Sequence, residues 1–155
     1  MIRNIIFTLI LATTYSSIHG QNLKETPENI INEFFKLLDE NKTEKAVEYI
    51  FSNNPWMKGV KSIESTMNEL KANVSKMGEF YGAQQLSKAT AGKDLVSYSY
   101  LAKYDRQPLR FIFAFYRPND KWQIHYFKYD DELTDELLEA LAAYRLNENI
   151  DLGDY

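Results

Sequence analysis

The chain of 155 residues contains no cysteine, so it is neither a cysteine-acylated lipoprotein nor a domain held together by disulfides. Glycine and proline are also scarce, with 6 and 4 residues, and the sequence has no glycine-rich phosphate loop and no nucleophile elbow. Stability must therefore come from a packed apolar core. A chain of this length with 45% hydrophobic residues is sufficient for one such domain.

Basic residues are not concentrated on any one predicted face, because the lysines are scattered through helices and hairpin ends. This argues against nucleic acid as a partner. The acidic segment 130–139, "DDELTDELLE", lacks the glycine of a calcium-binding loop, and Asp135 and Glu136 suit a helix N-terminus instead. His125 is the one histidine outside the first 20 residues, and with no cysteine beside it we expect no metal site and no cofactor.

The first 20 residues, "MIRNIIFTLILATTYSSIHG", read as a secretory leader. Arg3 precedes an apolar run from Ile5 to Ala12, which is about half as long as a membrane-spanning helix requires. We expect cleavage after Gly20, leaving a single domain over residues 21–155 that is exported to the periplasm or outside the cell. The sequons at Asn41 and Asn73 matter only in a eukaryotic secretory pathway, which the sequence leaves open.

Three helices are predicted before residue 78. Thr26 is the N-cap of the first and Pro27 its first residue, with the helix ending near Asn41. Thr43 is expected to cap the second. The third has a regular helical spacing of apolar residues, Ile63, Met67, Leu70, Val74 and Met77, which predicts packing on a sheet.

After Gly78 the apolar period changes to two, which predicts four antiparallel strands in a meander. If Tyr104 pairs with Leu109 and Arg117 with Trp122, the alternation assigns each strand residue to one of two faces. The predicted core face carries Tyr98, Tyr100, Ala102, Leu109, Phe111, Phe113, Phe115, Trp122, Ile124 and Tyr126. The predicted outer face carries Ser97, Ser99, Leu101, Arg110, Ile112, Ala114, Tyr116, Gln123, His125 and Phe127. A one-residue slip in either hairpin would mix the faces.

The predicted chain has three helices followed by a curling meander, with "NPWM" after the second helix and the closing pattern "FAFYRPNDKWQIHYF". Together these features resemble the nuclear transport factor 2-like superfamily. The resemblance covers about Pro27 to Asp130 and implies an α+β fold, with N-terminal helices packed on a curved antiparallel sheet as a cystatin-like cone. It also implies a pocket inside the cone and frequent dimerisation through the other sheet face. Segment 133–149 adds a C-terminal helix, which we expect Thr134 to cap.

Enzymes of this superfamily, such as isomerases, dehydratases and cyclases, need acid–base groups inside the cone. The predicted core face has no carboxylate, so we assign no catalytic residues and expect a binding domain rather than an enzyme. The candidates for a small apolar ligand are Trp56, Met57, Tyr98, Tyr100, Phe113 and Tyr126. Sheet tyrosines usually bury the ring in the core and leave the hydroxyl at a wet rim, so Tyr98, Tyr100 and Tyr126 are predicted to belong to the core more than to a pocket. Trp56 and Met57 could either line a pocket mouth or plug it.

The outer sheet face is predicted to be too apolar to remain uncovered. Its candidate interface residues are Leu101, Ile112, Tyr116, His125 and Phe127. Either the C-terminal helix or a second copy of the chain could cover it. The sequence therefore leaves three function classes: a domain that binds a small apolar ligand, peptide or partner protein, a structural module with a filled cone, and an enzyme.

Overall fold

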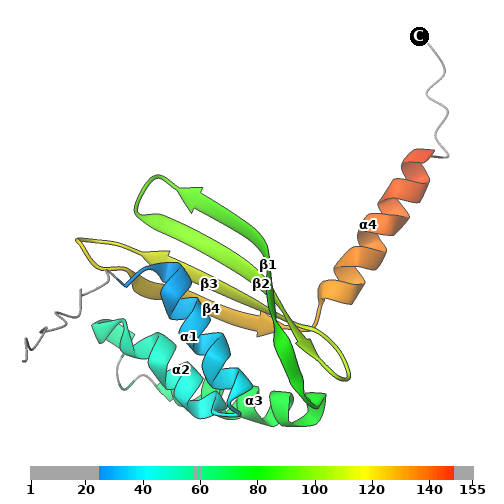
Figure 1. Cartoon of the computed structure of the whole chain (residues 1–155). Helices are drawn as coiled ribbons and strands as arrows, with labels where there is room; N and C mark the ends of the chain where they lie inside the picture. The colour runs from blue at the N-terminus through cyan, green and yellow to red at the C-terminus, as the bar shows by residue number, and fades with distance from the viewer. Residues whose placement is uncertain (1–24, 58, 60, 149–155) are drawn as a thin grey trace, which may run out of the picture.

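The computed structural model describes residues 25–57, 59 and 61–148 (Figure 1). It is an α+β fold in which three N-terminal helices cover one face of an open, four-stranded antiparallel sheet of order β1-β2-β3-β4. A fourth helix follows the last strand. The predicted leader lies outside the described residues. Among the described helices, none has the length and apolar character needed to cross a bilayer.

Helix α1 (Pro27–Asp39) provides the helical side of the core. Thr26 caps it as predicted, since its hydroxyl accepts a hydrogen bond from the Asn29 amide at 3.3 Å. Phe34 is fully buried and meets the rings of Phe111 and Phe113 edge-on, with centroids 5.5 and 5.3 Å apart. Aromatic rings of the sheet are therefore covered by rings of α1.

Helices α2 (Thr43–Ser52) and α3 (Lys61–Met77) complete the helical layer, with the short 3-10 helix η1 (Pro55–Met57) between them. Lys42, not Thr43, occupies the N-cap of α2 and makes no side-chain capping bond, so the predicted cap is wrong by one residue. After α3 the chain turns at Gly78, where φ is +87° and a Cβ atom would lie 2.5 Å from Oδ2 of Asp105. Only glycine fits both conditions.

The sheet consists of β1 (Phe80–Ala91), β2 (Leu95–Tyr104), β3 (Leu109–Tyr116) and β4 (Gln123–Asp130). Leu109 pairs with Ala102 rather than with Tyr104, so the β2–β3 loop is longer than predicted. Because this shift is two residues, the faces of β2 and β3 stay as predicted. The buried face of these strands carries Val96, Tyr98, Tyr100, Ala102, Leu109, Phe111, Phe113 and Phe115.

Strand β4 contains a bulge that overturns part of the predicted face assignment. Phe115 pairs with Ile124, but Ala114 pairs with Tyr126, so His125 is an extra residue without a partner across the ladder. Every side chain after the bulge changes face. Tyr126 is therefore 49% exposed on the outer face, whereas Phe127 packs on the core against Phe113, with ring centroids 5.5 Å apart.

Helix α4 (Leu133–Glu148) leads away from the sheet and from the three other helices (Figure 1). It begins at Leu133, so Thr134 lies in the first turn and is not the predicted cap. Its first turn is held to the sheet by Arg110, whose Nη1 lies 2.6 Å from Oε2 of Glu136. The outer sheet face is consequently not covered by α4 of the same chain.

Candidate binding site around η1

Two asparagines at the end of α2 attach η1 to the edge strand β4. Asn53 pairs with this strand as a neighbouring strand would, because Nδ2 donates to the Trp122 carbonyl at 2.8 Å and Oδ1 accepts from the Ile124 amide at 2.7 Å. Asn54 is 8% exposed, and its Nδ2 donates to the Ile124 carbonyl at 2.7 Å while Oδ1 accepts from the Trp56 amide at 3.0 Å. These bonds satisfy backbone groups of an open sheet edge and fix the position of Trp56 and Met57.

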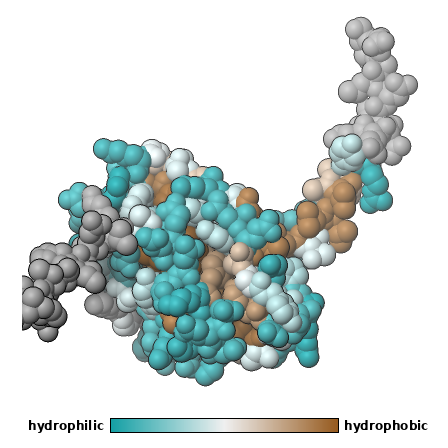
Figure 2. Space-filling view, in the orientation of Figure 1, coloured by the Kyte–Doolittle hydropathy of each residue, from teal (hydrophilic) through white to brown (hydrophobic). Residues whose placement is uncertain are grey.

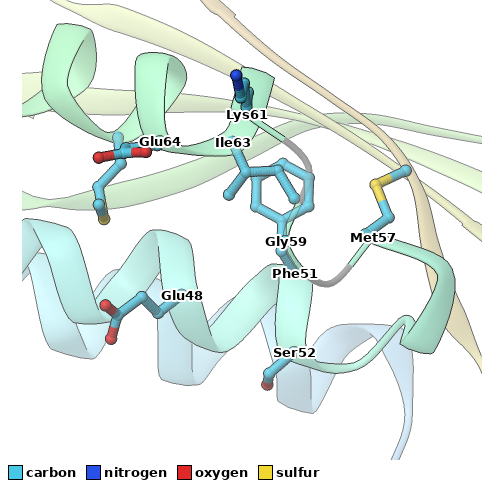
Figure 3. A pocket seen from close by; sticks show the side chains of 9 residues that line it. Glu48, Phe51, Ser52, Met57, Gly59, Lys61, Ile63 and Glu64 are labelled. Atoms are coloured by element: carbon cyan, nitrogen blue, oxygen red, sulfur yellow. The ribbon is translucent and has the colours of Figure 1, made fainter.

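A cavity of about 350 Å³ opens between α2, η1 and α3 (Figure 3). We call it the helix cavity. Its apolar walls are Phe51 of α2, Met57 of η1, and Ile63 and Met67 of α3. All four side chains are only partly buried, so an apolar group entering the cavity would remove further apolar surface from water.

Charged and small residues complete the wall of the helix cavity. Glu48 and Glu64 come from opposing helices, and Lys61 stands at the start of α3 (Figure 3). All three side chains are exposed. Gly59 has φ +74° and open space where a Cβ would be. The charged groups are therefore solvated and leave an apolar interior.

A second hollow lies on the other side of η1, at the edge of the sheet. This sheet-edge depression has a volume of about 580 Å³ and is lined by Asn54, Trp56, Met57, Tyr116, Pro118, Gln123 and His125. Trp56 is 87% exposed, and the Tyr116 and His125 rings meet edge-on with centroids 6.4 Å apart. Met57 lines both hollows, so η1 is the ridge between them.

The structure places the predicted pocket residues in three different environments. Trp56 and Met57 are on η1, beside Tyr116 and His125, which the sequence suggested as interface residues. Tyr98, Tyr100 and Phe113 are buried beneath α1, where they pack with other rings of the core. Tyr126 is on the outer sheet face, away from these three.

The predicted interface residues also separate. Leu101 and Ile112 lie half-buried on the outer face, as predicted for those strands. Phe127 does not lie there, because the bulge at His125 moves it to the core face, where its ring contacts Phe34 and Phe51 at centroid distances of 5.7 Å. That contact also makes Phe127 a support beneath Phe51, one wall of the helix cavity.

One carboxylate does reach a tyrosine of the core face. The Tyr98 hydroxyl donates to Oε1 of Glu28 at 2.5 Å, and Nζ of Lys88 lies 2.8 Å from the same oxygen. Burial acts to raise the pKa of Glu28, but the hydrogen bonds from Lys88 and Tyr98 outweigh it and lower the pKa to about 2. Burial and the bond to Glu28 raise the pKa of Tyr98 to about 12.

These two pKa values describe a fixed hydrogen bond rather than an acid–base pair. Glu28 stays ionised and Tyr98 stays neutral through the neutral range, whereas efficient proton transfer needs a pKa near the working pH. Within the part of the chain that the structure describes, no group of three or more His, Asp or Glu side chains is arranged to hold a metal ion.

Sequence reasoning missed the lining of the helix cavity. The regular spacing of Ile63 and Met67 predicted only packing on a sheet, and no local pattern distinguishes an apolar residue that fills a core from one that borders a hollow. Asn53 and Asn54, which hold η1 on β4, also had no predicted role in a site. No family model, curated protein or solved structure matches the chain.

Proposed function

We propose that this protein is an exported, non-catalytic domain that binds one apolar group of a small ligand or peptide in the helix cavity beside η1. The observation that carries the proposal is the solvent-accessible apolar hollow of about 350 Å³ between Phe51, Met57, Ile63 and Met67. That volume is near the lower end of ligand sites, which suits a single acyl chain, ring or apolar side chain. Met57 and Met67 have flexible thioethers that adapt to different shapes.

Binding through this cavity alone is expected to be weak. Burial of about 0.8 kcal/mol per methylene gives roughly 5 kcal/mol for a six-carbon group, equivalent to a Kd of about 0.1–1 mM. A natural ligand would therefore add contacts outside the cavity. The adjoining sheet-edge depression offers Trp56 and Tyr116 for this purpose, since both side chains are exposed and aromatic.

The finer features of the fold and the location belong to the same proposal. The order of helices and strands supports a cystatin-like cone related to the nuclear transport factor 2-like superfamily. The leader supports export to the periplasm or the outside. Recovery of a mature chain beginning at Gln21 from the envelope or medium would agree with export, and intact Met1 in a membrane pellet would contradict it.

The alternative is an isomerase, dehydratase or cyclase acting inside the cone. Glu28 and Tyr98 are the groups available for it, and their pKa values of about 2 and about 12 argue against proton transfer near neutral pH. The core rings Phe34, Phe111 and Phe113 are fully buried between α1 and the sheet, which supports a filled interior rather than a substrate chamber. Binding beside η1 is the function that this arrangement favours.

A cavity-filling substitution tests the proposed site. We expect the wild type to bind the neutral apolar dye N-phenyl-1-naphthylamine with increased fluorescence, and Ile63→Trp to bind it at least about tenfold more weakly. Ala72→Trp is the matched control, because Ala72 is exposed on the same helix and does not line the cavity. Circular dichroism confirms that each variant folds. Equal affinity in all three proteins would place the dye elsewhere and contradict the proposal.

A further inference from the structure

Helix α4 has a stripe of large apolar side chains that nothing in the described chain covers. Leu137, Leu138, Leu141 and Tyr144 are 63%, 58%, 56% and 63% exposed. The space-filling view shows apolar surface along this helix where it leaves the body (Figure 2). Residues 137, 141 and 144 are spaced by four and three, so their side chains lie on one side of the helix. Such a stripe on a surface helix marks a contact with another surface.

Arg110 fixes the orientation of α4 and so the position of this apolar stripe. Its side chain is 12% exposed and lies on the outer sheet face, with Nη2 2.9 Å from Oδ1 of Asp130, which is 7% exposed. Its Nη1 binds Glu136 in the first turn of α4. This nearly buried clamp directs α4 away from its own sheet (Figure 1). With Glu136 held at Arg110, the rest of α4 extends beyond the sheet rather than over its outer face (Figure 1).

The outer face of the sheet is the second surface that no helix of the described residues covers. Three of the four residues at its centre have small side chains, because Ser97 pairs with Ala114 and Ser99 pairs with the larger Ile112. Tyr116 and Tyr126 stand at its border and are 46% and 49% exposed. Helices α1, α2 and α3 all lie on the opposite face. A shallow, partly apolar floor between larger side chains can accept a helix.

We infer that the protein forms a reciprocal dimer in which α4 of each copy packs on the outer sheet face of the other. One chain supplies both the helix and the sheet face, so a twofold arrangement satisfies both surfaces in both copies. This inference concerns a surface separate from the helix cavity and does not depend on the proposed function.

The dimensions of the two surfaces agree. Helix α4 has 16 residues and is about 24 Å long and about 10 Å wide. Strand β3 has eight residues and is about 26 Å long, and two neighbouring strands are together about 10 Å wide. Two such contacts, counted on both surfaces, bury roughly 1,000 Å², which is about the minimum area that a biological interface needs. Pairing α4 only with the partner's α4 would bury about half as much and leave both sheets uncovered.

The charges also fit. Asp135 and Glu139 make the polar side of α4 acidic, and the exposed Lys103 lies on the outer sheet face. Glu136 and Lys128 are already paired within their own chain, Glu136 with Arg110 and Lys128 with Asp130 and Glu132. Opposite charges at the rim favour this dimer and its orientation. The acids of α4 oppose insertion of the helix into an anionic membrane surface.

Sedimentation of the protein from Gln21 onward tests the dimer. The wild type should sediment as a dimer at micromolar concentration and Leu141→Asp as a folded monomer, with the dissociation constant of the dimer raised at least about a hundredfold. Leu141 is already exposed, so this change should not unfold the domain. Ala143→Asp is the matched control, since it adds the same charge on the side of α4 that carries Glu139. A monomeric wild type, or a Leu141→Asp variant that stays dimeric, would overturn the inference.

Site-specific cross-linking tests the reciprocal packing, and the chain's lack of cysteine gives a clean background. Leu141→Cys and Ala114→Cys are near the middle of α4 and β3. Mixed single variants should give a covalent dimer with a short bis-maleimide, while each variant alone should give little. Three results would overturn the arrangement: Leu141→Cys alone cross-linking efficiently, Ala114→Cys alone doing so, or the double variant linking only within one chain.

Discussion

At the scale of single residues, the hydroxyl of Tyr98 shows how a core side chain can depend on a charge at the rim. Tyr98 is 2% exposed, yet its hydroxyl donates to Glu28, which is also bound by Lys88. We expect Tyr98→Phe to lower the free energy of unfolding by about 1–2 kcal/mol at neutral pH, less than a fully buried charged hydrogen bond because Glu28 is partly solvated. Urea unfolding measures this directly.

The same variant should have a pH-dependent effect of known sign. Since folding lowers the pKa of Glu28 from 4.5 to about 2, its contribution to stability is present above pH 4.5 and is lost as the pH falls toward 2. The difference between wild type and Tyr98→Phe should therefore shrink at about pH 3. Tyr100→Phe is the control, because its hydroxyl bonds to the neutral amide of Gln85. A Tyr98 effect that is constant with pH would contradict the charged bond.

At the scale of elements, the bulge in β4 explains both the success and the failure of the sequence reasoning. Alternation predicted the faces of β2 and β3 correctly, because all the aromatic residues of "SYSYLA" and all those of "RFIFAF" fall in one phase of their strand. In β4 the adjacent rings of Tyr126 and Phe127 provide an apolar residue in either phase. Local pattern could not decide between them, and packing of Phe127 against Phe34 and Phe113 selects the bulged register.

Two single-residue deletions test this register. Deleting His125 should leave Ile124, Tyr126 and Phe127 opposite their present partners in a regular ladder, so we expect a loss of at most about 1 kcal/mol. Deleting Lys128 should instead move Tyr129 and Asp130 to opposite faces and remove a partner of Arg110. That change should cost at least about 3 kcal/mol. Chemical denaturation distinguishes the two, and equal losses would mean that His125 is not the extra residue.

At the scale of the whole molecule, the sequence indicated the α+β class and the helical and strand segments. It did not indicate which candidate site residues would lie close together in space. Helices and strands follow from local periodicity, and a capping residue such as Thr26 can be read directly. The position of η1 depends on Asn53 and Asn54 bonding to β4, about 70 residues later in the chain. Such contacts have no local signature, so Met57 was a candidate while Phe51, Ile63 and Met67 were not.

The methionines can report directly whether an apolar group binds in the helix cavity. After residue 20 the chain has three of them, and Met57 and Met67 line the cavity whereas Met77 does not. In methyl-labelled protein titrated with a neutral medium-chain alcohol, the NMR signals of Met57 and Met67 should shift together along one saturating curve, while Met77 stays in place. Unchanged Met57 and Met67 signals at millimolar alcohol, or equal shifts at all three methionines, would contradict the account.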